Sequence, residues 1–180
     1  MDVLHAPWRI DYILAPKNPV ETGEASLFTA IGQSGDDEAN YVIARGRTCY
    51  VVLNTYPYNG GHLMVVPYRQ IATLEELTDD EALELMQWSR RCVLALRTVM
   101  KPQGFNVGYN LGKCAGAGIV EHLHLHIVPR WEGDTNFMPV IANSRVVPEA
   151  LKETAAKLRA ALAAAVAGRI LTLPPTPSPP

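Results

Sequence analysis

Residues 121–130 read Glu121-His122-Leu123-His124-Leu125-His126-Ile127-Val128-Pro129-Arg130, and three of the five histidines of this 180-residue chain stand there at alternate positions. Side chains of a β-strand alternate between the two faces of a sheet, whereas successive residues of a helix turn by about 100°. The pattern therefore predicts a strand that carries three imidazoles on one face and packs the intervening aliphatic side chains into the core.

Three imidazoles on one face are suited to two kinds of chemistry. Neutral histidine nitrogen is a ligand for zinc. Alternatively, one imidazole attacks phosphorus while its neighbours hold a proton and charge in place. The spacing alone leaves both interpretations open, and it disfavours a polar strand face that has no chemical role.

Residues 122–128 resemble, at all seven positions, the motif of the histidine triad (HIT) family, in which hydrophobic residues separate and follow three histidines. The resemblance implies a nucleotidyl hydrolase or transferase that acts on the α-phosphate of a nucleotide, with the middle histidine, His124, as the nucleophile. It also implies that His126 and His62 contact phosphate oxygens and that His122 supports the array. A homodimer with a continuous sheet is a further implication.

Residues 54–67 are similar to a second segment of the family, in which an asparagine precedes a Gly-His pair and a hydrophobic strand. In relatives the asparagine hydrogen-bonds a nucleotide ribose and the histidine lies beside the triad. The resemblance assigns these roles to Asn54 and His62. Without the triad, the same two residues would be interpreted as a turn cap and the end of a strand.

Residues 111–118 form a loop of small residues that leads directly into the triad. Its glycines permit positive φ, and backbone N–H groups in such a turn make an anion-binding nest. The candidate substrate-binding residues here are Asn110, Lys113, Gly116 and Gly118. The form Ala-Gly-Ala-Gly-Ile at 115–119 is similar to the branch of the family that includes dinucleoside tetraphosphate (Ap4A) phosphorylases and hydrolases.

Four positions of the chain correspond to those that bind a structural zinc in many relatives. Many relatives bind a structural zinc through a Cys-x-x-Cys pair and two histidines, but this chain has Ser26, Thr29 and Gln70 at three of these places and keeps only His122. Hydroxyls and an amide are poor zinc ligands. We therefore expect neither a structural zinc nor a required cofactor, while a magnesium ion bound to the substrate stays open.

The remaining sequence predicts an α+β fold with an antiparallel sheet of about five strands. The other strands are expected at 41–45, 48–53, 62–67 and 105–110. A long helix packed on the sheet is expected at 79–100, introduced by a capping box and buried through a stripe that includes Leu83 and Met86. The domain is expected to span 1–172, with an arm at 1–20, a C-terminal helix at 148–169 and a disordered Pro-rich tail at 173–180.

The composition limits the classes of partner. A net charge of −2 gives no basic field for nucleic acid, and no apolar run of about 18 residues predicts a membrane span. Three widely spaced cysteines and an N-terminus without a signal-peptide pattern indicate a cytoplasmic setting. The favoured function is cleavage of an adenosine-containing dinucleoside polyphosphate through a nucleotidyl-histidine. The alternatives are an Ap4A phosphorylase that uses inorganic phosphate, a non-catalytic nucleotide- or metal-binding module, and a scaffold that acts through the tail.

Overall fold

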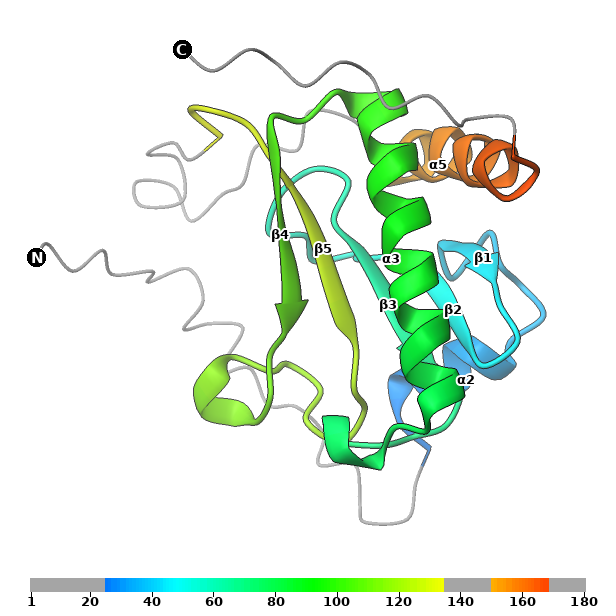
Figure 1. Cartoon of the computed structure of the whole chain (residues 1–180), viewed down its shortest axis with the longest axis vertical. Coiled ribbons are helices and arrows are strands. Elements are labelled where there is room, and N and C mark those ends of the chain that lie inside the picture. The colour runs from blue at the N-terminus through cyan, green and yellow to red at the C-terminus, as the bar shows by residue number, and fades with distance from the viewer. Residues whose placement is uncertain (1–24, 135–149, 169–180) are drawn as a thin grey trace, which may run out of the picture.

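The computed structural model describes residues 25–134 and 150–168 (Figure 1). The predicted arm at 1–20 and the predicted tail at 173–180 lie outside the described residues, as do the first two residues and the last residue of the predicted C-terminal helix.

The sheet has five strands in the order β1-β2-β3-β5-β4, and every neighbouring pair is antiparallel. The strands are β1 (Val42–Arg45), β2 (Cys49–Leu53), β3 (Leu63–Pro67), β4 (Gly104–Tyr109) and β5 (Leu125–Arg130). The predicted α+β class and strand number are confirmed. Because β5 lies between β3 and β4, its first residues, which include His126, are flanked by strands on both sides.

Two helices cover one face of this sheet (Figure 1). Helix α3 (Asp79–Met100) has the predicted bounds, and it begins with the predicted capping box, in which Thr78 accepts from the backbone of Glu81. The Arg69 guanidinium bonds to the Glu81 carboxylate and lowers its pKa to about 2. Helix α5 (Leu151–Val166) packs against α3 and β1. It is the described part of the predicted C-terminal helix.

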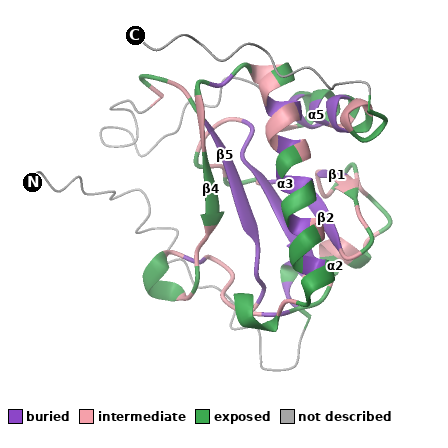
Figure 2. Ribbon diagram, viewed as in Figure 1, coloured by how far each residue is buried: buried purple, intermediate pink, exposed green. Residues whose placement is uncertain are grey.

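The predicted buried stripe of α3 is wrong in its first half. Leu83 and Met86 are 59% and 60% exposed, whereas Leu85 and Trp88 are buried. Figure 2 shows buried and exposed stretches following one another along α3. Both sets have helical spacing, so periodicity alone does not distinguish them. The side that faces the sheet is set by the packing of α3 against the hydrophobic cluster of β2, β3 and β5.

The opposite face of the sheet carries a seven-residue helix, α2 (Leu27–Gln33), that the sequence did not predict. Its Phe28 packs with Tyr50, Met64 and Val66 in a second hydrophobic cluster. Two short 3-10 helices, η1 (Leu74–Glu76) and η2 (Lys113–Ala115), complete the described elements. Within residues 25–134 and 150–168, no helix combines the length and the apolar character needed to cross a bilayer.

Strand β5 begins later than predicted. Regular pairing with β3 reaches back only to Leu125, so His122 and His124 precede the strand. The partner strand ends at Pro67, which has no N–H to continue the ladder. The chain turns instead to the segment after β3, where the Leu123 N–H donates to the carbonyl of Ile71 over 2.6 Å.

Candidate active site

The structure gathers the four predicted catalytic histidines into one buried group. His62 lies just before β3, His122 and His124 lie just before β5, and His126 lies within β5. The ring centroids of His124 and His126 are 4.7 Å apart, and those of His62 and His126 are 5.1 Å apart. His126 pairs across the sheet with Met64, so its side chain lies on the face that α2 covers.

A backbone carbonyl holds the ring of His124 in one tautomer. Its Nδ1 lies 2.8 Å from the carbonyl oxygen of His122. An oxygen of this kind only accepts, so Nδ1 carries the proton and Nε2 carries the lone pair. Burial lowers the pKa of His124, because desolvation disfavours the charged ring. The side chain is therefore a neutral imidazole with a nucleophilic Nε2 at neutral pH.

A second chain of bonds fixes the other two rings. The backbone N–H of Tyr58 donates to Nδ1 of His62 over 3.1 Å. Nε2 of His62 must then carry its proton, and this nitrogen lies 2.9 Å from Nδ1 of His126. His126 therefore accepts at Nδ1, and in its neutral form it carries a proton at Nε2. Hydrogen-bond geometry thus makes His126 a donor at the nitrogen that faces away from His62.

These bonds account for the lone pairs of the four rings. His62, His122 and His126 each accept a hydrogen bond at Nδ1. Among the described residues, the bonds of the array leave a ring lone pair unassigned only at Nε2 of His124. No cluster of three or more histidine, cysteine or acidic side chains within residues 25–134 and 150–168 has the arrangement of a metal site. One available lone pair suits a nucleophile better than it suits a multidentate metal site.

The four positions that many relatives use for zinc also lie together. Ser26 Oγ is 2.5 Å from His122 Nδ1, and Gln70 Oε1 accepts both the backbone N–H of Ser26 (2.9 Å) and the hydroxyl of Thr29 (3.0 Å). The donors are thus hydrogen-bonded to one another, and they consist of two hydroxyls, an amide oxygen and one imidazole. This set does not fit zinc, which prefers thiolate and imidazole ligands.

Asn54 lies one residue beyond the end of β2, as predicted, and beside His62. Its Oδ1 accepts the backbone N–H of Tyr56 over 2.9 Å, and its Nδ2 lies 3.3 Å from Nδ1 of His62. Asn54 therefore both closes a turn and contacts the array. Its predicted contact with ribose stays a prediction.

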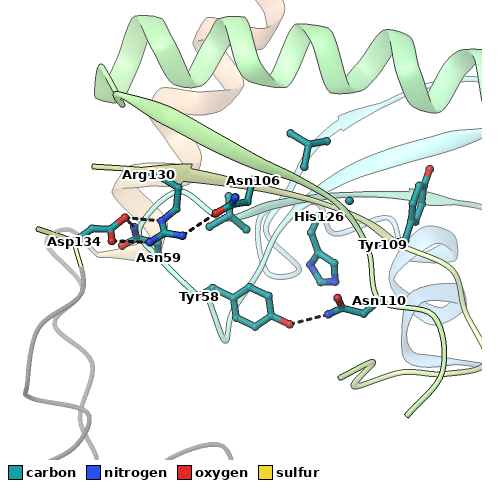
Figure 3. A pocket seen from close by; sticks show the side chains of 11 residues that line it. Tyr58, Asn59, Asn106, Tyr109, Asn110, His126, Arg130 and Asp134 are labelled. Carbon is teal, nitrogen blue, oxygen red and sulfur yellow. Dashed lines mark hydrogen bonds and ion pairs between the residues drawn. The ribbon is translucent and has the colours of Figure 1, made fainter. Parts of the chain in front are cut away.

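A polar cavity of about 380 Å³ opens next to His126 (Figure 3). The described residues that line it include Tyr58, Tyr109, Asn110, Arg130 and Asp134. Tyr58 stacks on His126 with ring centroids 5.5 Å apart, and its hydroxyl accepts from Nδ2 of Asn110 over 3.1 Å. Asn110 thus lies beside the array, and its predicted contact with substrate stays a prediction. The sequence did not single out Tyr58, although it lies in the Asn54–Gly61 loop that resembles the family.

The far end of the cavity is closed by a charged group. Arg130 binds Asp134 through Nε at 2.6 Å and Nη2 at 2.9 Å, and its Nη1 donates to Asn106 over 2.7 Å. Asn59 also donates to Asp134. The charge of Arg130 is therefore largely compensated within the protein.

The other predicted substrate contacts lie in the turn between β4 and β5. Lys113 is exposed on η2, and Gly116 ends η2 with φ +89°, the positive φ expected for this loop. Gly118 follows and is half-buried. None of the three is among the residues that line the cavity. Their contact with substrate stays a prediction.

The sequence of this chain is similar to those of known proteins. Residues 37–133 match the model of the HIT domain. The chain is 48% identical over 155 residues to the AP-4-A phosphorylase of Mycobacterium tuberculosis, covering 84% of this chain and 79% of that protein. It is 31% identical over 93 residues to the asymmetrical bis(5'-nucleosyl)-tetraphosphatase of Schizosaccharomyces pombe, covering 52% of this chain and 50% of that protein.

The fold is also similar to a solved structure. The Zn-bound histidine triad family protein from Mycobacterium smegmatis superposes with a TM-score of 0.65 at 27% identity, covering 80% of this chain and 97% of that one.

Proposed function

This chain belongs to the HIT domain family, and from that premise we propose that it cleaves a dinucleoside polyphosphate, or a comparable adenylyl compound, at the α-phosphate. The observation that carries the proposal is the neutral ring of His124, whose Nδ1 proton is held by the His122 carbonyl and whose Nε2 lone pair is left for attack.

In the first step, Nε2 of His124 attacks the α-phosphorus in line. A P–N bond forms while the bond from phosphorus to the bridging oxygen breaks, and its electron pair leaves with the polyphosphate. Positive charge develops on the His124 ring, and the His122 carbonyl stabilises it through the Nδ1 proton. The Nε2–H of His126 donates a hydrogen bond to an oxygen that gains charge.

The family resemblance implied that His62 contacts a phosphate oxygen, but we propose an indirect role for it. Its Nε2 proton is used by His126, so we assign it the role of orienting His126. We place the leaving part of the substrate in the cavity beside His126 and the adenosine at the Asn54 loop. Asn110, Lys113, Gly116 and Gly118 remain the proposed contacts for the phosphate chain.

We propose inorganic phosphate as the acceptor. With Ap4A as substrate, the first step releases ATP, and attack of phosphate on the adenylyl-histidine gives ADP. Water as the acceptor would give AMP instead. The name of the relative from Mycobacterium tuberculosis, which is 48% identical over most of both chains, supports phosphate. The tetraphosphatase from Schizosaccharomyces pombe, at lower identity and coverage, keeps hydrolysis as the alternative.

We also propose a homodimer. Strand β4 is an edge of the sheet, and Val107 at its centre is 50% exposed. An edge strand presents unpaired backbone groups that a second copy can use. A magnesium ion carried by the substrate is compatible with this arrangement, and no residue of the chain is assigned to it.

Product analysis tests the function. Purified protein is incubated with Ap4A, with and without isotopically labelled inorganic phosphate, and the nucleotides are separated and counted. We expect ATP and labelled ADP in equal amounts, with little AMP. AMP as the main product in the presence of phosphate would establish the hydrolase alternative. Nucleotide binding without turnover would support a non-catalytic module.

A further inference from the structure

The buried ring of His122 is held at both of its nitrogens. Nε2 lies 2.9 Å from the carbonyl oxygen of Pro67, and Nδ1 lies 2.5 Å from the hydroxyl oxygen of Ser26. The carbonyl can only accept, so Nε2 carries the ring proton and Nδ1 accepts the proton of the Ser26 hydroxyl. Ser26 and His122 have no exposed surface, so solvent does not compete for this bond.

Neighbouring groups direct the Ser26 hydroxyl toward His122. Ser26 is the N-cap of α2, where its Oγ accepts the backbone N–H of Thr29 over 3.1 Å. Its own backbone N–H donates to Gln70 Oε1, and the Thr29 hydroxyl donates to the same oxygen. With these protons assigned, His122 Nδ1 is the acceptor that the Ser26 proton satisfies.

The constraint on His122 reaches His124 through the backbone. The carbonyl that accepts the Nδ1 proton of His124 belongs to His122 itself. The two bonds to the His122 ring oppose a shift of the His122 backbone, and such a shift would displace that carbonyl from the His124 ring. Phe28 of α2 adds a second link, because its ring centroid lies 5.7 Å from that of His122 and 5.0 Å from that of His124.

We propose that Ser26 is a positioning residue for His124. Its hydroxyl locks the His122 ring between α2 and Pro67, and the His122 carbonyl then holds His124 in the tautomer whose Nε2 is the nucleophile. The hydrogen-bonded set of Ser26, Thr29 and Gln70 thus fixes the array in this chain, although these side chains do not fit a metal. The catalytic part of this inference rests on the proposed function.

The kinetic test uses the full-length Ser26→Ala variant. We expect kcat for Ap4A to fall roughly tenfold to a hundredfold, because a small displacement of a reacting group has an effect of this size. KM should stay within about twofold of the parent, since Ser26 is not placed at the substrate. Ser26→Thr, which keeps the hydroxyl and remains a good N-cap, should restore most of kcat.

A matched control separates positioning from the loss of a buried hydroxyl. Ser89 is also buried, and its hydroxyl donates to the Leu85 carbonyl within α3. Ser89→Ala therefore removes a comparable group away from the array, and its kcat should equal that of the parent. If Ser26→Ala does not fold, Gln70→Ala, which removes the oxygen that anchors the Ser26 backbone, takes its place in both tests.

The second readout needs no substrate. Long-range ¹H–¹⁵N spectra of the histidine rings show which ring nitrogen carries the proton. In the parent protein we expect His122 with Nε2–H and His124 with Nδ1–H, and in Ser26→Ala we expect His124 to become a mixture of tautomers. If the parent does not turn over Ap4A, the proposed function fails, and the spectra still decide whether Ser26 holds the tautomer.

Three results would overturn the proposal. The first is a Ser26→Ala variant with the kcat of Ser89→Ala. The second is a fall in kcat with unchanged nitrogen shifts, because Ser26 would then act by another route. The third is a Ser26→Thr variant as slow as Ser26→Ala, because the hydroxyl would then not be the group that matters.

Discussion

The Nε2 atom of His62 donates a hydrogen bond to Nδ1 of His126 over 2.9 Å, and the direction of this bond is fixed by the backbone of Tyr58. His126 therefore presents its own proton away from His62. The main-chain N–H of Tyr58 thus determines which nitrogen carries the proton in both His62 and His126. Through this chain of bonds, His62, in the loop before β3, sets the position of the donor proton on His126 in β5.

Replacing His62 tests that relationship. In His62→Ala, Nδ1 of His126 loses its donor and the ring is free to exchange tautomers. We expect kcat to fall by at least about tenfold, with a smaller change in KM. Steady-state kinetics measure the effect, and His62→Gln, which keeps an amide donor, serves as the conservative comparison. A kcat equal to that of the parent would contradict the orienting role.

The His124→Ala variant removes the proposed nucleophile. We expect turnover to fall by several powers of ten, because the covalent route is lost, while the fold and nucleotide binding remain. Circular dichroism and equilibrium binding of adenosine monophosphate provide the controls. Residual activity above about a hundredth of the parent would argue against a nucleotidyl-histidine.

Asn54 is expected to hold the ribose. Loss of one neutral hydrogen bond costs about 0.5–1.5 kcal/mol, and an unsatisfied buried partner costs more. Asn54→Ala should therefore weaken adenosine monophosphate binding roughly threefold to a hundredfold, as measured by calorimetry. Asn54→Asp keeps the oxygen that closes the turn with Tyr56 and separates loop damage from loss of the amide donor. Unchanged affinity in both variants would show that the ribose is bound by residues other than Asn54.

We expect the folded protein to contain no structural zinc. The Thr29 hydroxyl donates to the amide oxygen of Gln70, and the Ser26 hydroxyl donates to His122. Elemental analysis of protein purified without chelators should find much less than one zinc per chain. One zinc per chain that withstands mild chelation would refute this prediction.

The capping box of α3 predicts a dependence of stability on pH. The pKa of Glu81 is lowered from 4.5 to about 2, chiefly by its bond to Arg69. The folded-state pKa lies below the unfolded one, so the contribution is present above about pH 4.5 and is lost as the pH falls toward 2. Arg69 is half-exposed, so Glu81→Gln should lower the free energy of unfolding at pH 7 by only about 0.5–1 kcal/mol.

Urea unfolding at several pH values measures this difference. The gap between the parent and Glu81→Gln should close on acidification. Asp79→Asn removes a charge from the same first turn, where Asp79 is exposed, and its effect should be smaller. A gap that widens below pH 4 would contradict the assignment.

Local sequence signals predicted the elements that depend on local chemistry. The Thr78 cap gave the start of α3, and hydrophobic runs bounded by turn residues gave the strands. The helix α2 was missed because its seven residues carry little periodic signal. Its cap, Ser26, bonds to a partner 96 residues away. Spacing within the triad could not show that β5 begins only at Leu125, because the limit is set by Pro67 on a neighbouring strand.

Helix α2 is too short to persist by its own backbone bonds and depends on what it packs against. It packs on the sheet through Phe28 and on His122 through Ser26. A local opening of its roughly two turns would therefore remove the support of His124 while the five strands stayed paired. On warming, catalytic inactivation should therefore come before loss of the secondary structure, and cooling from that intermediate temperature should return the activity without refolding of the sheet.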